Sequence, residues 1–287
     1  MNVVIIGAGK MGSAIAKELA TDDVPVTLWN RTPQKLDQLK LQISSASFKT
    51  STDLKECVST ADVIITLLTS GAIVEEVLLS QDLLSLCKKS AIIVDMSTSG
   101  VATPHVLNKA IHAAGLRFVD APVSGSMATI ASHQLLVMAS GDADAIEEVS
   151  PILMKFSKLV VNLGPAGNGQ VMKLAVNMVV HTLNVAIAES LKIATLSGIS
   201  LEKAYDILDA SVITSPFLKY KRPAFMQSDT PVAMRIDTVL KDMNLIQDLG
   251  NQLGITLFAT PAIKDAYSEA VAQGLSDRDM ARLIDAV

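Results

Sequence analysis

The sequence predicts an α/β fold: a doubly wound parallel sheet, followed by a long linking helix and an all-α C-terminal domain. Short apolar runs alternate with helical patterns through the first half of the chain, which is typical of strand–helix–strand units. A Gly-rich segment, residues 162–169, ends this alternation. After it we find no convincing strand pattern, and apolar residues recur at helical spacing instead.

The expected strands are short and rich in β-branched residues, so they suit a sheet that helices cover on both faces. They are 3–6, 26–29, 63–67, 91–94, 117–119, 135–138 and 159–161. Helical patterns separate them, at 11–20, 33–42, 71–79, 101–114 and 143–156.

The second half is expected to be helical throughout. Residues 170–197 are expected to form one long helix, because apolar residues such as Leu183, Ile187 and Leu191 recur every four residues, the spacing of one helix face. Shorter helices follow at 201–211, 217–227, 236–252, 261–273 and 277–286. We therefore assign residues 1–163 to the first domain. Residues 164–287, the linking helix included, form a helical domain for substrate binding and oligomerisation.

Composition narrows the class of protein. The 287 residues are 49% hydrophobic and 18% charged, as in a globular protein, and the net charge of −5 without a basic block argues against a nucleic-acid partner. Apolar runs have strand length and no basic segment opens the chain, so we expect neither a membrane span nor a signal peptide. Cys57 and Cys87 make no disulfide framework, which favours a cytoplasmic protein. The four histidines lack metal-ligand spacing.

A phosphate-binding motif follows the first expected strand. The six residues after this strand, which lead into the first expected helix, have the pattern GxGxxG: Gly7, Ala8, Gly9, Lys10, Met11 and Gly12. Gly7 permits a tight turn, Gly9 lets the backbone approach a pyrophosphate, and Gly12 lets the helix pack closely on the strand. The helix N-terminus offers N–H groups and a partial positive charge to the phosphates. The sequence therefore predicts a Rossmann-type dinucleotide site.

The end of the second expected strand indicates which dinucleotide binds. Asn30 lies 18 residues after Gly12, where an Asp or Glu usually holds the ribose 2′-OH of NAD. Here the residue is neutral, and Arg31 and Thr32 follow it. A carboxylate would repel a 2′-phosphate, whereas a guanidinium forms charge-assisted hydrogen bonds with it, worth roughly 1.5–3 kcal/mol. The predicted cofactor is NADP(H).

An oxidoreductase also needs a proton donor and a means of holding its substrate. Lys173 lies in the first turn of the long helix, and Asn177, four residues on, projects from the same face. A partly desolvated Lys can protonate a carbonyl oxygen as hydride reaches the carbon. Ser97, Thr98 and Ser124 follow expected strands, at strand ends where open α/β sheets bind ligands.

Five motifs in this order resemble the β-hydroxyacid dehydrogenase family, which includes 3-hydroxyisobutyrate dehydrogenase. They are Gly7–Gly12, Asp95–Thr98, Asp120–Gly125, Gly167–Gly169 with Met172–Leu174 and Asn177, and Lys241–Met243. The resemblance covers essentially the whole chain. It implies a homodimer or homotetramer, and a small carboxylate-bearing aldehyde or hydroxy acid as substrate.

The resemblance also implies roles for individual residues. Lys173 would be the general acid and base, and Asn177 would orient the reacting groups. Implied substrate contacts are Thr98, Ser124, Gly125, Ser126, Met234 and Asp242. Implied cofactor contacts beyond the Gly-rich turn are Asn30, Arg31, Thr32, Leu67, Leu68, Ser97 and Lys241.

Within this family the sequence is similar to the glyoxylate and succinic semialdehyde reductases, a branch that prefers NADPH. Trp29–Thr32 and Met172–Met178 carry this similarity. The loop 127–134 departs from the branch, because His133 replaces the usual Gly and the usual acidic residue is missing. Met234 stands where the branch tends to have a Phe over the substrate, and a thioether is softer and more adaptable than a ring.

The leading hypothesis is an NADPH-dependent reductase of small aldehyde acids. Three alternatives stay open: a 3-hydroxyisobutyrate-type dehydrogenase, an imine reductase on the same scaffold, and a non-catalytic NADP-binding module. Imine reductases tend to carry Asp or Tyr at the position of Lys173. An idle module needs neither Lys173 nor Asn177, so the presence of both residues favours the reductase.

Overall fold

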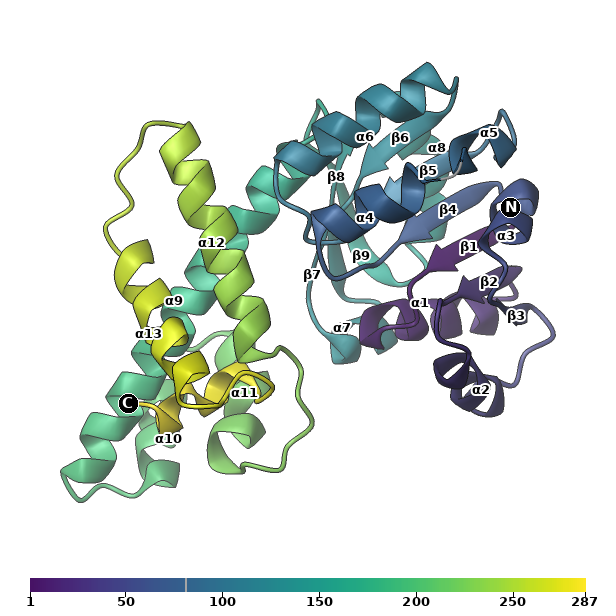
Figure 1. Cartoon of the computed structure of the whole chain (residues 1–287). Helices are drawn as coiled ribbons and strands as arrows, with labels where there is room; N and C mark the ends of the chain where they lie inside the picture. Colours follow the sequence, from purple (N-terminus) through teal and green to yellow (C-terminus); the bar gives the residue numbers. More distant parts are fainter. Residues whose placement is uncertain (81) are drawn as a thin grey trace. The chain divides into compact units, whose positions relative to one another are not determined.

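The computed structural model describes residues 1–80 and 82–287, which form two compact units, Met1–Lys173 and Leu174–Val287 (Figure 1). The limit between the units falls inside one continuous helix, α9 (Asn168–Leu196). The domain boundary expected between residues 163 and 164 stays a prediction, since compactness alone does not say where a functional domain begins.

The first unit is a sheet flanked by helices. Its strands, in the described residues, are β1 Val3–Ile6, β2 Val26–Trp29, β3 Phe48–Ser51, β4 Val63–Thr66, β5 Ile92–Asp95, β6 Arg117–Asp120, β7 Val123–Ser124, β8 Leu135–Gly141 and β9 Ser157–Asn162. Its helices before α9 are α1 Lys10–Thr21, α2 Pro33–Gln42, α3 Leu54–Thr60, α4 Gly71–Leu78, α5 Leu83–Leu86, α6 Ala102–Ala113, α7 Met127–Ala131 and α8 Ala143–Leu153.

The strand order explains where a ligand can bind. The order is β3-β2-β1-β4-β5-β6-β8-β7, with β9 beside β8, and β1 to β6 are all parallel. The order switches direction between β1 and β4. Open α/β sheets bind ligands outside the carboxyl ends of the strands at such a point. The predicted Rossmann-type sheet is confirmed, and the Gly-rich turn lies at this switch point.

One part of the sheet departs from the parallel pattern. β8 runs antiparallel to β6 and β7, with Ser140 opposite Asp120. Parallel neighbours need a crossover of a dozen or more residues, usually through a helix. Only β7 and the five-residue α7 lie between β6 and β8, so the chain turns back instead.

Both faces of the sheet are buried, as the apolar strands predict. Along β1, Val3 and Ile5 belong to one apolar cluster, and Val4 and Ile6 belong to the other. Helices α1 and α8 cover the first face, and α3, α4 and α6 cover the second (Figure 1). Full burial of a Val or Ile side chain is worth roughly 1.5–3 kcal/mol. Burial of these strands therefore stabilises the edge of the sheet at their carboxyl ends, where the loops after β1, β4 and β5 begin.

The structure contains short elements that the sequence patterns did not predict. β3 reads Phe-Lys-Thr-Ser and lies half-exposed beside β2, so it lacks an apolar signal. α3 and α7 are too short to show a helical period. A cap marks the start of α3, where the Asp53 side chain accepts a hydrogen bond from Glu56 N–H at 3.0 Å.

The second unit is helical. After α9 come α10 Leu201–Ala210, α11 Pro216–Met226, α12 Ile236–Gln252, α13 Thr260–Ala272 and the 3-10 helix η1 Met280–Asp285. α12 and α13 lie side by side, and both contact α9 (Figure 1). The helix expected at 277–286 corresponds to η1, which is shorter than predicted and is a 3-10 helix. Its start is set by Asp279, whose side chain accepts a hydrogen bond from Ala281 N–H at 3.0 Å.

α9 is long and apolar enough to cross a bilayer by length and composition, with a mean hydropathy of 1.5 over its apolar window. The central helix of a globular domain passes the same test. The buried side chains of Asn177, His181 and Asn184 favour this second interpretation, because both Asn side chains bond to neighbouring helices. We therefore describe α9 as a core helix.

His133 adopts a backbone conformation that suits glycine. Its φ is +54°, in the left-handed region that costs other L-residues roughly 1–2 kcal/mol. Its exposed ring lies 3.3 Å from Glu18 Oε2, a surface pair that contributes little. The loop after α7 is therefore strained at His133.

We expect His133→Gly to raise the free energy of unfolding by about 1 kcal/mol, because it removes this strain. Ser132→Gly is the matched control. Ser132 has an ordinary φ of −98°, so glycine at this position relieves no strain. Because glycine increases the conformational entropy of the unfolded chain, Ser132→Gly should lower the free energy of unfolding by about 0.5–1 kcal/mol. Urea unfolding measures both variants. Equal losses would show that His133 is not strained.

Candidate active site

The Gly-rich turn after β1 has the geometry of a phosphate cradle. A Cβ on Gly7 would lie 2.3 Å from the Leu67 carbonyl oxygen, and one on Gly12 would lie 2.1 Å from the Gly7 oxygen. Both positions therefore require glycine. A Cβ on Gly9 would meet nothing within 4 Å, so the backbone there faces open space at the start of α1. These residues fit a pyrophosphate, which accepts hydrogen bonds from N–H groups at a helix N-terminus.

Asn30 braces this cradle. Its side-chain oxygen accepts a hydrogen bond from Ala8 N–H at 3.2 Å, and its Nδ2 donates to the Thr32 oxygen at 3.0 Å. The sequence predicted a cofactor contact for Asn30 but not this bracing. Arg31 is exposed in the same loop, and Lys10 is exposed at the start of α1.

The loops after β4 and β5 complete this edge of the sheet. Leu67 N–H donates to the Ile6 oxygen at 3.0 Å, and Leu68 N–H donates to Ser97 Oγ at 2.9 Å. The Ser97 hydroxyl is buried and holds the loop after β4, whereas Thr98 is partly exposed. The structure thus brings Leu67, Leu68 and Ser97 together, beside the glycine turn.

Two buried carboxylates stand at the ends of β5 and β6. Asp95 and Asp120 are opposite each other in the strand register. Asp95 accepts hydrogen bonds from the Thr66 hydroxyl at 2.7 Å and from Ser97 N–H at 3.0 Å. Burial raises the pKa of Asp120 to about 7, and the nearby Asp95 carboxyl adds to the rise. Hydrogen bonds from Gln170 oppose it.

Asp120 fastens the first turn of α9 to the sheet. It accepts hydrogen bonds from Gln170 N–H at 3.2 Å and from Gln170 Nε2 at 2.8 Å. The Gln170 amide also donates to the Ser97 oxygen at 2.9 Å and accepts from Ser99 N–H at 3.1 Å. A Cβ on Gly169 would lie 2.8 Å from the Asp120 carboxylate, so glycine permits this approach. The helix N-terminus also favours the negative charge.

The predicted general acid follows this anchored turn. Lys173 lies three residues after Gln170 and is partly exposed. Asn177 is buried one turn later, and its Nδ2 donates to Asp242 Oδ2 at 2.7 Å. Lys241 Nζ lies 3.1 Å from Asp242 Oδ1. The helical unit thus brings together three predicted residues that come from α9 and α12.

Sequence reasoning missed one member of this cluster, His181. It is fully buried, and its Nε2 lies 3.7 Å from Asp242 Oδ2. The sequence suggests no role for it beyond metal binding, and no group of three or more His, Cys, Asp or Glu among the described residues could hold a metal ion. The missed signal is spacing: Lys173, Asn177 and His181 recur every four residues, on one face of α9.

The expected substrate turn follows β7. Ser124 is partly buried and Gly125 is exposed, with a φ of +144°. A Cβ on Gly125 would lie 2.2 Å from Thr129 Oγ1, which also accepts a hydrogen bond from Ser126 N–H at 2.6 Å. The turn therefore needs glycine, and Thr129 of α7 fixes its shape.

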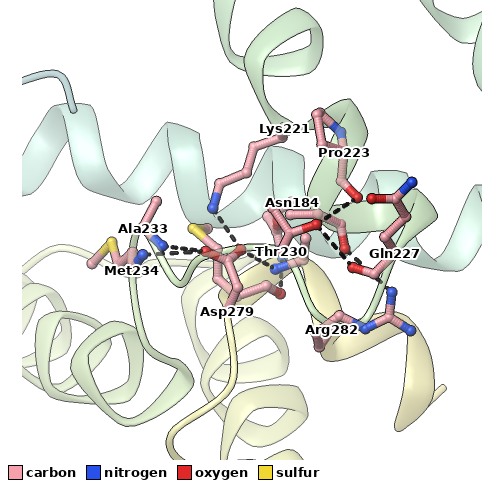
Figure 2. A network of polar contacts seen from close by, with 12 residues as sticks. Asn184, Lys221, Pro223, Gln227, Thr230, Ala233, Met234, Asp279 and Arg282 are labelled. Atoms are coloured by element: carbon pink, nitrogen blue, oxygen red, sulfur yellow. Dashed lines mark hydrogen bonds and ion pairs between the residues drawn. The ribbon is translucent and has the colours of Figure 1, made fainter. Parts of the chain in front are cut away.

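Met234, another expected substrate contact, lies in a segment that Asp279 holds through hydrogen bonds (Figure 2). Asp279 accepts hydrogen bonds from Ala233 N–H at 2.8 Å and Met234 N–H at 3.3 Å, and Lys221 Nζ lies 2.6 Å from it. Lys221 and Asp279 are both buried. Burial opposes ionisation of Asp279, but the Lys221 charge and hydrogen bond hold the pKa of that carboxyl below its usual range. A buried ion pair thus sets the backbone at Met234.

Comparisons with known proteins agree with this architecture. Residues 2–164 match the NAD-binding domain of 6-phosphogluconate dehydrogenase, and residues 167–287 match the NAD-binding domain of NADP-dependent 3-hydroxyisobutyrate dehydrogenase. Glyoxylate/succinic semialdehyde reductase 1 of Arabidopsis thaliana is 34% identical over 289 residues, which cover 100% of this chain and 98% of that protein.

Two further relatives widen the comparison. Cytokine-like nuclear factor N-PAC of Homo sapiens is 31% identical over 276 residues, which cover 96% of this chain and 49% of that protein. The crystal structure of a 3-hydroxyisobutyrate dehydrogenase from Salmonella typhimurium shares the fold, with a TM-score of 0.91 at 23% identity over 100% of both chains.

The N-terminal half matches a dinucleotide-binding domain and the helical half matches a dehydrogenase domain. Together these matches identify the chain as an NAD(P)-dependent oxidoreductase. The matches over both halves, and the full-length identity of 34%, identify the family as well. The chain belongs to the β-hydroxyacid dehydrogenase family, as its motifs predict.

The raised pKa of Asp120 predicts a pH dependence of stability. Native Asp120 keeps its proton up to about pH 7, whereas an Asp in the unfolded chain releases it near pH 4. Between these values the native state binds more protons, so the free energy of unfolding falls as pH rises. We expect a loss of about 1–2 kcal/mol between pH 5 and pH 7.

Urea unfolding measures this loss through the fluorescence of Trp29, the single tryptophan, which is buried in the first unit. Asp120→Asn does not titrate and serves as the control, so its stability should vary less over the same range. A wild-type stability that rises from pH 5 to pH 7 would contradict the raised pKa.

Proposed function

We propose that this protein is an NADPH-dependent reductase of small aldehyde acids, of the glyoxylate and succinic semialdehyde type, with Lys173 as general acid. The first turn of α9 carries this proposal. Asp120 and Gln170 hold that turn on the edge of the sheet that carries the dinucleotide cradle. Lys173 is the next ionisable residue along the helix. A relative that is 34% identical over the whole chain bears the name of this activity.

The preference for NADP(H) over NAD(H) rests on the loop after β2. The Asn30 side chain bonds to Ala8 and Thr32, and the exposed Arg31 adjoins it. A 2′-phosphate at this loop would meet a guanidinium and no carboxylate from residues 30–32. The family that residues 167–287 match is also described as NADP-dependent.

The proposed chemistry divides between cofactor and protein. Bound NADPH supplies a hydride to the carbonyl carbon of the substrate. The Lys173 ammonium donates a proton to the carbonyl oxygen, so that no alkoxide has to form unaided. Asn177 orients the reacting groups, and Asp242 fixes its amide. Lys241 contributes to the nicotinamide site.

The substrate contacts belong to the same proposal. Ser124 and the backbone N–H of Gly125 bind the carboxylate, because a turn with this shape exposes donors at a strand end. Thr98 lies after a neighbouring strand, and Ser126 completes the turn. Met234 packs against the rest of the substrate, and its flexible thioether suits more than one aldehyde acid.

Lys173→Ala is expected to lower kcat by about 10²–10⁴, the usual contribution of a positioned acid. NADPH binding, followed by fluorescence titration, should stay near normal. Lys192→Ala is the matched control, because Lys192 lies on the same helix but donates to the Ile284 oxygen at 3.5 Å. If Lys173→Ala keeps most of its turnover with aldehyde acids, Lys173 is not the general acid.

Arg31→Asp is expected to raise the KM for NADPH far more than the KM for NADH, since it places a carboxylate beside the 2′-phosphate. Lys40→Asp makes the same change of charge in the last turn of α2, where the Lys is exposed, and should affect the two cofactors alike. Steady-state kinetics with both cofactors measure the difference. Equal effects of Arg31→Asp on both KM values would exclude a contact with the phosphate.

A second candidate function is a non-catalytic NADP-binding module. It is favoured by the 31% identity to N-PAC, whose name describes a nuclear factor and no reaction. A panel of aldehyde acids, keto acids and cyclic imines, tested with NADPH and NADH, separates the candidates. Binding of NADPH without its oxidation across the panel would favour the module, and fastest turnover of an imine would favour an imine reductase.

A further inference from the structure

His181 is a buried imidazole that the proposed reaction does not use. It lies on α9 one turn beyond Asn177 and is fully buried. α12 faces it through Asp242, and α13 faces it through Tyr267, whose ring lies edge-on with its centroid 6.3 Å from that of the imidazole. Burial of a polar ring costs free energy unless the ring has a partner.

The group that His181 faces is the carboxylate of Asp242. Its Oδ2 atom lies 3.7 Å from His181 Nε2 and 2.7 Å from Asn177 Nδ2, so one oxygen faces both side chains of α9. Its Oδ1 atom lies 3.1 Å from Lys241 Nζ. Asp242 is only 1% exposed, so bulk water does not solvate its charge and the surrounding side chains set its orientation.

We propose that His181 is a positioning residue, which holds Asp242 in the rotamer that fixes the Asn177 amide. The inference rests on the proposed function, because it takes Asn177 as the residue that orients the reacting groups. Without the imidazole, the carboxylate loses a contact on its α9 side. It can then turn toward Lys241, and Asn177 Nδ2 loses its acceptor.

The effect reaches the proposed general acid through α9. While Nδ2 donates to Asp242, the Asn177 amide presents its oxygen on the opposite side. Helix side chains lean toward the N-terminus, where Lys173 lies one turn earlier. The amide oxygen of Asn177 can accept a hydrogen bond from the Lys173 ammonium. If that ammonium shifts by about 1 Å, the reaction rate can fall about 10²-fold. Loss of His181 should therefore lower turnover and leave cofactor binding unchanged.

Steady-state kinetics with glyoxylate, succinic semialdehyde and NADPH test this inference. His181→Leu is expected to lower kcat about 10–100-fold without changing the KM for NADPH. His181→Gln should recover most of the turnover, because its amide nitrogen reaches toward the place of Nε2. Asn184→Leu is the matched control: Asn184 is buried on the same helix but donates to Tyr267 and Met280, so its loss should lower stability and not kcat.

A double-mutant cycle separates positioning from packing. If His181 acts through Asp242, His181→Leu should lower kcat no further in an Asp242→Asn background. Additive losses would overturn the inference, as would a wild-type kcat for His181→Leu or an equal loss in Asn184→Leu. Should the Leu variant not fold, His181→Asn replaces it, since its amide is one methylene shorter than that of Gln and does not reach Asp242.

Lys173→Ala distinguishes failure of this inference from failure of the proposed function. If that variant keeps its turnover, the proposed function is wrong. If it is inactive while His181→Leu behaves as wild type, only the role of His181 is wrong.

Discussion

The functional edge of the first unit depends on one buried carboxyl group. Asp120 ends β6 where bulk water does not reach, so its carboxyl group must find its hydrogen-bond partners within the chain. The Ser140 hydroxyl donates to it at 2.9 Å, Gln170 donates from both backbone and side chain, and the N-terminus of α9 adds its dipole. These contacts fix the first turn of α9. They thereby fix the side of the helix from which Lys173 projects.

This arrangement couples the dinucleotide cradle to the helix that carries the proposed acid. The Gln170 amide contacts the loop after β5, and Ser97 in that loop accepts the N–H of Leu68 from the loop after β4. Burial also raises the pKa of Asp95, so two adjacent carboxyls resist ionisation. This hydrogen-bond network ties the loops after β4 and β5 to the first turn of α9 and so restricts the geometry of the strand ends.

The sequence predicts those parts of the protein that local patterns encode. Strands such as β1 and β4 are recognisable because burial on both faces demands apolar runs, and Gly7 and Gly12 because backbone contacts exclude a Cβ. β3 escapes prediction because an exposed edge strand has no apolar pattern. The contact between His181 and Asp242 joins residues of two helices, and no local pattern shows which face of one helix meets the other. The roles of the predicted site residues, Lys173 included, stay predictions.

The Lys221–Asp279 pair has a consequence for the order in which the protein matures. The backbone at Met234 is held by a carboxylate that comes 45 residues later in the chain. During synthesis, the segment around Met234 therefore leaves the ribosome before its anchor exists. The glycine turn can form much earlier, because Gly7 contacts Leu67 and Leu68 and the Ala8 N–H donates to Asn30. A nascent chain can thus form the glycine turn well before the backbone at Met234 is held in place.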